Sequence, residues 1–143
     1  MARVMLLGNV GCGKTTLIQK LRGADIVYAK TETTQRGEDY IDTPGEYLAY
    51  GFMRRALQQS SYDAKLIGFL QSAVEPRATI QPGFHTYFTQ PVIGIVTKID
   101  LATPDQIGRA RRWLELAGAR TIVEVSALTG AGLDELRELL AGH

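Results

Sequence analysis

The residues best placed to do chemistry form a glycine-rich segment near the start of the chain. Gly8-Asn9-Val10-Gly11-Cys12-Gly13-Lys14-Thr15 matches the pattern G-x-x-x-x-G-K-[ST] at every fixed position. In this pattern the glycines let backbone N–H groups turn inward around phosphates, and the lysine reaches the β and γ phosphates as a point charge. The Thr15 hydroxyl is placed to ligate Mg²⁺. The segment therefore predicts a site for a nucleoside triphosphate and its magnesium ion.

A strand before this loop and a helix after it must hold it in place. Arg3-Val4-Met5-Leu6-Leu7 is an apolar run typical of a buried strand. A helix is expected from Lys14 through Leu21, with Gly23 as its C-terminal stop. The positive end of that helix would face the phosphates. Strand, glycine loop and helix are the setting that the motif requires. A chance glycine-rich turn would not need this setting.

A second motif, D-x-x-G, follows a weak strand over residues 38–41. It consists of Asp42-Thr43-Pro44-Gly45. A carboxylate at Asp42 can hold Mg²⁺ through water, and the Gly45 N–H can sense the γ-phosphate. Alone, the motif also fits an ordinary turn.

A third motif points to the base of the nucleotide. Thr97-Lys98-Ile99-Asp100 follows an apolar run and fits [NT]-K-x-D. The Asp100 carboxylate can accept from N1–H and N2–H₂ of guanine, whereas adenine presents no such pair of donors. The Lys98 stem can cover one face of the base. A turn at a strand end, with a solvated lysine and a capping aspartate, would explain the same residues.

Ser126-Ala127-Leu128 follows the last apolar run, where the Ala127 N–H could meet guanine O6. This tripeptide says little by itself. All four motifs, however, follow the expected strands in order, and open α/β sheets bind ligands at the carboxyl ends of their strands. Their order and spacing together predict a nucleotide-binding protein.

Strand-like apolar runs alternate with helical patterns along the rest of the chain, which predicts a mostly parallel central sheet with helices on both faces. The segment 24–37 reads as a mobile loop with a short strand near 26–28, and 71–90 has no good helical period. Further strands are expected at 65–70, 92–96 and 121–125, and helices at 50–60, 104–117 (Thr103 as N-cap) and around Leu133, Leu136, Leu139 and Leu140.

Composition narrows the classes of function. The chain has 143 residues, 45% hydrophobic and 22% charged, which suits a single globular domain. A net charge of +1 provides no basic surface for nucleic acid or an anionic membrane. No apolar stretch has the length of a membrane span, no secretory signal pattern is visible, and one cysteine excludes an internal disulfide. We therefore expect a cytoplasmic protein.

By its four motifs the chain resembles the translation-factor-like (Ras-like) P-loop GTPases over its whole length. Narrower features resemble the EutP/PduV family of bacterial microcompartments: the sequence 41–47 (Ile-Asp-Thr-Pro-Gly-Glu-Tyr), the pair Lys30-Thr31, the loop Gly13-Lys14-Thr15-Thr16 and the small size. The resemblance implies a single minimal G domain over 1–143 that binds GTP or GDP with Mg²⁺. It also implies a loop threonine that closes on Mg²⁺ and the γ-phosphate. Thr31 matches best, with Thr33 and Thr34 close by.

Some positions depart from the Ras-like pattern. Glu46 stands where a glutamine often orients the attacking water, and its carboxylate would repel the γ-phosphate unless turned away. Val10 stands where Ras has glycine and adds bulk near the phosphates. We therefore expect slow hydrolysis.

Cys12 lies in a setting that can lower a thiol pKa, although a small side chain at a variable position is the simpler explanation. Several other candidates are expected to be surface, packing or isolated residues without a role: Arg36, Arg54, Arg55, His85, His143, Trp113 and Leu114.

Three functions compete. The leading one is a guanine-nucleotide-binding GTPase whose loop 24–37 and the segment after Gly45 differ between GTP and GDP, read by a microcompartment shell protein or an encapsulated enzyme. The second, brought by the EutP resemblance, is an acetate kinase that makes acetyl phosphate from ATP. The third is a module that binds nucleotide without turning it over. The fate of the γ-phosphate and the preferred base distinguish them.

Overall fold

The protein is built on a parallel five-stranded sheet. The computed structural model describes residues 3–9, 11–22, 40–42 and 54–141, with the backbone alone for Asp42 and Arg54. Every strand pair is parallel, and the strand order in the sheet is β2-β1-β3-β4-β5. The strands are β1 (Val4–Leu7), β2 (Tyr40–Asp42), β3 (Leu66–Ser72), β4 (Val92–Thr97) and β5 (Thr121–Glu124). The predicted parallel α/β sheet is confirmed.

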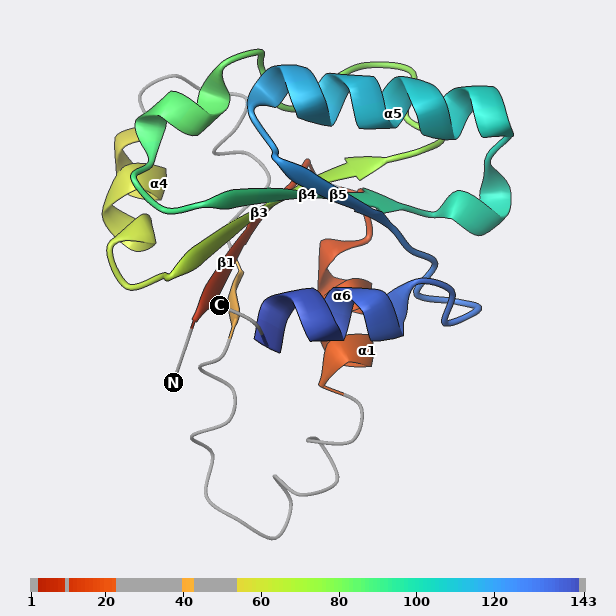
Figure 1. Ribbon diagram of the computed structural model, residues 1–143, viewed down its shortest axis with the longest axis horizontal. Coiled ribbons are helices and arrows are strands. Elements are labelled where there is room, and N and C mark those ends of the chain that lie inside the picture. Colours follow the sequence, from red (N-terminus) through yellow and green to blue (C-terminus); the bar gives the residue numbers. More distant parts are fainter. Residues whose placement is uncertain (1–2, 10, 23–39, 43–53, 142–143) are drawn as a thin grey trace, which may run out of the picture.

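Helices cover both faces of this sheet (Figure 1). One face carries the first and last helices, and the opposite face carries two helices from the middle of the chain. The helices are α1 (Lys14–Leu21), α4 (Arg54–Ser61), α5 (Pro104–Ala117) and α6 (Leu133–Ala141), with short 3-10 helices η3 (Phe84–Tyr87) and η4 (Ile99–Leu101). α1 and α6 lie side by side on one face, and α4 and α5 lie on the other.

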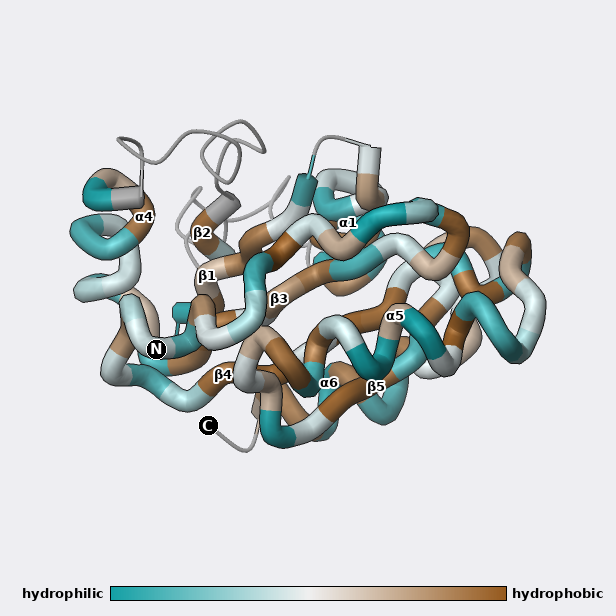
Figure 2. The backbone as a smooth tube through the Cα atoms, turned by 90° about the horizontal axis from the view of Figure 1, so that it is seen from above, coloured by the Kyte–Doolittle hydropathy of each residue, from teal (hydrophilic) through white to brown (hydrophobic). Residues whose placement is uncertain are grey.

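The strands are apolar on both faces because each face packs against helices. In β1, Val4 and Leu6 belong to the cluster under α1 and α6, and Met5 and Leu7 belong to the cluster on the side of α4 and α5. Mostly apolar residues accordingly run along β1 and β4, and along β3 as far as Leu70 (Figure 2). This near-continuous hydrophobicity is what a strand buried on two sides requires.

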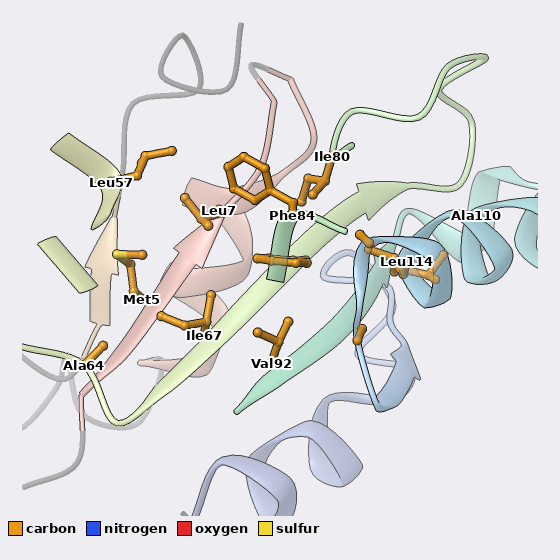
Figure 3. Packing of buried hydrophobic residues seen from close by; sticks show 14 of the residues in the cluster. Met5, Leu7, Leu57, Ala64, Ile67, Ile80, Phe84, Val92, Ala110 and Leu114 are labelled. Atoms are coloured by element: carbon orange, nitrogen blue, oxygen red, sulfur yellow. The ribbon is translucent and has the colours of Figure 1, made fainter. Parts of the chain in front are cut away.

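The connection from β3 to β4 contains no α-helix, in agreement with the sequence prediction for 71–90. Aromatic side chains pack it instead: Phe84 of η3 is buried, and its ring centroid lies 5.9 Å from that of Phe69 in β3 and 5.8 Å from that of Phe88. Figure 3 shows Phe84 and Ile80 beside Leu7 in this cluster. Buried Gln71 holds the start of the connection, because its amide donates to Arg77 O and accepts from Thr79 N.

Sequence signals place the ends of α5 correctly. Thr103 caps the helix, since its hydroxyl accepts from Gln106 N at 3.2 Å while the Gln106 side chain accepts from Thr103 N at 2.8 Å. Pro104 opens the helix, and Gly118 ends it at φ 109°, a left-handed conformation that favours glycine. The predicted loop 24–37, the strand near 26–28, the stop at Gly23 and the first part of the helix predicted at 50–60 lie outside the described residues.

Candidate functional site

The glycine-rich loop connects β1 to α1 at the carboxyl edge of the sheet. Gly11 and Gly13 have φ values of 84° and 91°, in the left-handed region. Residues with a side chain rarely adopt this backbone conformation, so the loop requires glycine at both positions. Cys12 N donates to Asn9 O at 3.1 Å, and Leu17 N donates to Gly13 O at 2.9 Å. The loop therefore closes tightly onto the first turn of α1.

The residues after Gly13 have the burial that their predicted roles require. Lys14 begins α1 and is 8% exposed, so its stem packs into the protein at the start of the helix. Thr15 and Thr16 are exposed in the first turn, where a ligand can reach their hydroxyls. Unpaired N–H groups of a first turn favour anions. Lys14 and the helix dipole thus place positive charge together at the loop.

Cys12 is a packing residue. Its side chain is 3% exposed, and a Cβ added to Gly8 would collide with the Cys12 sulfur. Burial raises the pKa of the Cys12 thiol above its usual value, and the charges of Lys14 and Lys98 oppose this only in part. The lowered pKa considered from the sequence is therefore wrong, and the small-side-chain explanation holds. Gly8 must be glycine because Cys12 and Leu70 fill the space beside it.

The motif after β4 is hydrogen-bonded directly to the glycine-rich loop. Thr97 Oγ1 donates to Cys12 O at 2.6 Å, and Lys98 Nζ donates to Gly11 O at 2.6 Å. Lys98 has φ 61°, a left-handed conformation uncommon for a non-glycine residue, and its stem passes Gly13. Strain of this kind is kept where the surroundings impose it, often at functional sites. Two hydrogen bonds thus join the two motifs, which lie more than eighty residues apart in the sequence.

Thr97→Val is expected to weaken nucleotide binding because it leaves the buried Cys12 carbonyl without its donor. An unsatisfied buried acceptor costs about 1–3 kcal/mol, so the affinity for GDP should fall roughly tenfold. Fluorescence titration with a labelled GDP would measure this. Thr97→Ser, which keeps the hydroxyl, is the matched control and should stay within about twofold of the parent. Loss of affinity in Thr97→Ser with none in Thr97→Val would show that the methyl packing, and not the hydrogen bond, matters.

Asp100 is held in place from β5. Ser126 is fully buried at the end of that strand, and its hydroxyl donates to Asp100 Oδ1 at 2.8 Å. The Ser126 hydroxyl oxygen also accepts from Thr129 N at 3.1 Å, which fixes the serine in turn. The Asp100 residue remains exposed to solvent in η4. Ser126 therefore orients a carboxylate that is available to a ligand.

A pocket of about 180 Å³ lies between these motifs. Lys98, Asp100, Leu101, Ala127 and Leu128 line it beside the glycine-rich loop. Leu101 is 66% exposed and Leu128 is 80% exposed, although large apolar residues usually avoid water. Apolar walls with one carboxylate suit a flat heterocycle that carries donors on its edge. Leu101 was not among the predicted site residues, although its place directly after Asp100 could have suggested it.

Thr31, Gly45 and Val10 lie outside the described residues, as do Glu46 and Arg36. Asp42 ends β2 beside Leu6 of β1, so its backbone is at the same sheet edge as the loop.

Within the described ranges, no cluster of three His, Cys, Asp or Glu residues could bind a metal, and no helix is long and apolar enough to cross a membrane. Arg55 is exposed and Leu114 is buried core. The Arg109 guanidinium lies 4.9 Å from the centre of the Trp113 ring.

The fold is similar to that of known proteins. Elongation factor SelB of Methanococcus maripaludis, solved in apo form, matches with a TM-score of 0.68 at 21% identity, over 99% of this chain and 32% of that chain. Its complex with the GTP analogue GPPNHP matches with a TM-score of 0.64 at 23% identity. This chain thus spans about a third of SelB. The likeness shows the P-loop GTPase fold that the motifs predicted.

Sequence comparison is more specific. The propanediol utilization protein PduV of Citrobacter freundii is 42% identical over 136 residues, covering 95% of this chain and 91% of that protein. The probable acetate kinase EutP of Escherichia coli (strain K12) is 26% identical over 143 residues, covering 99% and 90%. A family profile described as "Ethanolamine utilisation - propanediol utilisation" matches residues 1–142. The chain therefore belongs to the PduV-EutP family, as its narrower sequence features suggested.

Proposed function

We propose that this protein is a GTPase that binds guanine nucleotides and hydrolyses GTP slowly with Mg²⁺, and that the whole chain 1–143 is one minimal G domain. One observation carries this proposal. The Asp100 carboxylate, fixed by Ser126, lies in a pocket walled by Lys98, Leu101 and Leu128, next to a phosphate-type loop to which Lys98 is itself bonded. The proposed base site and the proposed phosphate site are thus joined by a direct hydrogen bond.

Guanine fits the carboxylate better than adenine does. N1–H and N2–H₂ of guanine are neighbouring donors, and an Asp100 carboxylate can accept both. The edge of adenine presents an acceptor and a C–H at the corresponding positions. A carboxylate left unpaired against adenine loses about 1–3 kcal/mol or more, which favours guanine. Ala127 lines the same pocket, and its N–H is the group we propose for guanine O6.

The residues at the loop suit a magnesium triphosphate. Mg²⁺ prefers hard oxygen ligands and phosphate oxygens, and Thr15 and Asp42, with Thr31, are the residues that we propose would hold it. When bound, the ion neutralises charge on the phosphates. Lys14 and the first-turn N–H groups bind the phosphate oxygens and orient the terminal phosphate. The Gly45 N–H is proposed to contact that phosphate.

Hydrolysis is expected to be slow without a partner. Glu46 replaces the water-orienting glutamine, and Val10 adds bulk where an attacking water or an incoming arginine would sit. With purified protein, Mg²⁺ and GTP, release of free phosphate should run well below about 1 s⁻¹, a typical lower enzyme rate. The release should be indifferent to acetate. Phosphate release above that rate, without an added partner, would contradict the expectation.

A second function has support from the relative EutP, which is named a probable acetate kinase. The same phosphate loop could serve if acetate replaced water as the acceptor of the phosphoryl group. Incubation with ATP and acetate, followed by hydroxylamine detection of acetyl phosphate, separates the two functions. Acetyl phosphate from ATP would overturn the guanine assignment. Tight binding with no turnover of either nucleotide would favour a binding module.

The link to metabolism comes from family membership. The 42% identical relative is a propanediol utilization protein, and we propose that this chain serves the same kind of pathway in the cytoplasm, at a microcompartment. A shell protein or an encapsulated enzyme is the partner that would read its nucleotide state.

A further inference from the structure

The outer edge of β5 is not used by the proposed reaction. β5 is last in the strand order β2-β1-β3-β4-β5, so β4 is its only neighbour among the described strands. Val125 N donates to Val96 O at 2.8 Å, and the backbone groups of alternate residues in a strand point to the same side. Thr121 and Val123 therefore bond to β4, whereas the N–H and C=O of Ile122 point away from the sheet.

The same alternation directs Arg120 O and Glu124 N outward. Arg120 N itself donates to Val92 O at 3.2 Å, and Gly132 lies so close to Glu124 O that a Cβ there would collide with it. The open part of the edge thus runs from Arg120 O through Ile122 to Glu124 N. Among the residues that the structure describes, no group is hydrogen-bonded to this open part. An unpaired edge of this kind is a template for another strand.

The side chains of these three residues lie on the face of the sheet that carries α5. Ile122 packs against the core cluster of that face, and Glu124 Oε2 accepts from Arg111 of α5 at 2.7 Å. Arg120 is exposed, and within the described part of the chain its guanidinium has no ion-pair or hydrogen-bond partner. Glu124 Oε1 accepts from no described residue. A cation, an apolar side chain and an anion therefore follow one another along this edge.

This order is complementary to itself about Ile122. When two copies of β5 pair antiparallel with Ile122 opposite Ile122, Arg120 of each copy lies opposite Glu124 of the other. Side chains directly opposite each other have Cβ atoms about 4.5–5.5 Å apart, which is within reach of an ion pair. In the same register, Ile122 N of each copy can donate to Ile122 O of the other, and Glu124 N can donate to Arg120 O. A shift of the register by two residues in either direction would separate both charge pairs.

We propose that two copies of this chain pair through their β5 edges about a twofold axis at Ile122, so that the two sheets become one continuous sheet. Native sheets often protect an edge with charge, because an edge of one sign repels its own copy. Here the charges have opposite signs at positions that the twofold axis relates, so a second copy is attracted at both ends. A twofold interface requires this kind of self-complementarity. A strand of another protein would have to present the same alternating order of charge.

Sedimentation velocity of the full chain without nucleotide, from about 5 to 500 µM, would test the pairing. The strand is short, so the expected Kd is about 10–100 µM. Arg120→Glu should weaken the dimer at least about tenfold, because both ion pairs become pairs of like charge. Arg112→Glu makes the same charge change at an exposed arginine of α5 and should leave the Kd unchanged. Since no nucleotide is present, the result does not depend on the proposed function.

A mixture of two variants tests the register itself. Arg120→Glu alone and Glu124→Arg alone should both be monomeric, since each places like charges opposite each other. In the mixed pair, one strand carries two carboxylates and the other carries two guanidinium groups, so both ion pairs return. The mixture should dimerise within about threefold of the parental Kd. Circular dichroism would verify that each variant is folded.

Three results would overturn the proposal: an unmodified protein that stays monomeric up to about 500 µM, a dimer that Arg120→Glu does not weaken, or folded variants whose mixture stays monomeric. Glu124→Arg also removes the bond to Arg111. If that variant does not fold, amide hydrogen exchange of the unmodified protein decides instead. Exchange of the Ile122 and Glu124 N–H groups should slow as the protein concentration rises. Exchange at these two groups that is independent of concentration would contradict the pairing.

Discussion

Asp100→Asn is expected to lower the affinity for GDP about 100-fold and to create a preference for xanthosine diphosphate. In the proposed base site, two hydrogen bonds to a charged group, each contributing about 1.5–3 kcal/mol, depend on this carboxylate. An asparagine amide can still accept from N1–H, but its NH₂ faces the N2–H₂ of guanine, donor against donor. Xanthine has a carbonyl at that position and can accept. Competition binding of GDP, XDP and ADP would measure the change.

The control for Asp100→Asn is Asp134→Asn. Asp134 is an exposed carboxylate at the start of α6, with a side chain that is 99% exposed in a surface pair with Arg137. It carries the same charge change without touching the pocket, so GDP affinity should not move. If Asp100→Asn bound GDP as well as the parent does, the base would not lie against this carboxylate. A uniform loss of all three nucleotides would point to a folding defect instead.

Lys14→Met is the other change with a large expected effect. Lys14 is 8% exposed, and methionine fills much the same buried volume, so the fold should persist. The charge that we propose reaches the phosphates is lost, however. Charge-assisted hydrogen bonds of about 1.5–3 kcal/mol each are removed, which predicts at least about a 100-fold loss in GTP affinity. Isothermal titration with GTP and Mg²⁺ would measure it.

Lys20→Met is the matched control for Lys14→Met, since Lys20 is exposed in the last turn of the same helix. Its GTP affinity should equal that of the parent. Thermal unfolding of both variants without nucleotide should give similar midpoints. A Lys14→Met protein that folds and still binds GTP with parental affinity would mean that the loop does not hold the triphosphate.

Local patterns made most of the fold predictable. The strand over 3–7, the limits of α5 and the irregular segment after β3 each depend on residues close together in the sequence, such as Thr103, Pro104 and Gly118. Hydrophobic periodicity and helix-capping residues are patterns among such sequence neighbours, so they can be recognised in the sequence directly. The motifs of the site were predictable for the same reason, because each is a short pattern placed after an apolar strand.

The contacts between motifs were not predictable. The bonds from Thr97 and Lys98 to the glycine-rich loop join segments more than eighty residues apart, so they depend on how the sheet brings β1 and β4 to one edge. The burial of Cys12 against Gly8 is likewise a tertiary effect, and it raises the thiol pKa, opposite to the lowered pKa that the sequence left open as the less simple explanation. Leu101 was missed because an exposed leucine acquires meaning only beside Asp100 and Leu128.

The most direct test of the account is the base preference of the unmodified protein. Equilibrium competition of unlabelled GDP and ADP against a fluorescent guanine nucleotide, with Mg²⁺ present, measures the relative affinities for the two nucleotides. These affinities depend on the Asp100 carboxylate, the pocket walls and the glycine-rich loop together. GDP should bind at least about 100-fold more tightly than ADP, because in the proposed site Asp100 pairs with two donors that adenine lacks. Equal binding, or tighter binding of ADP, would contradict it.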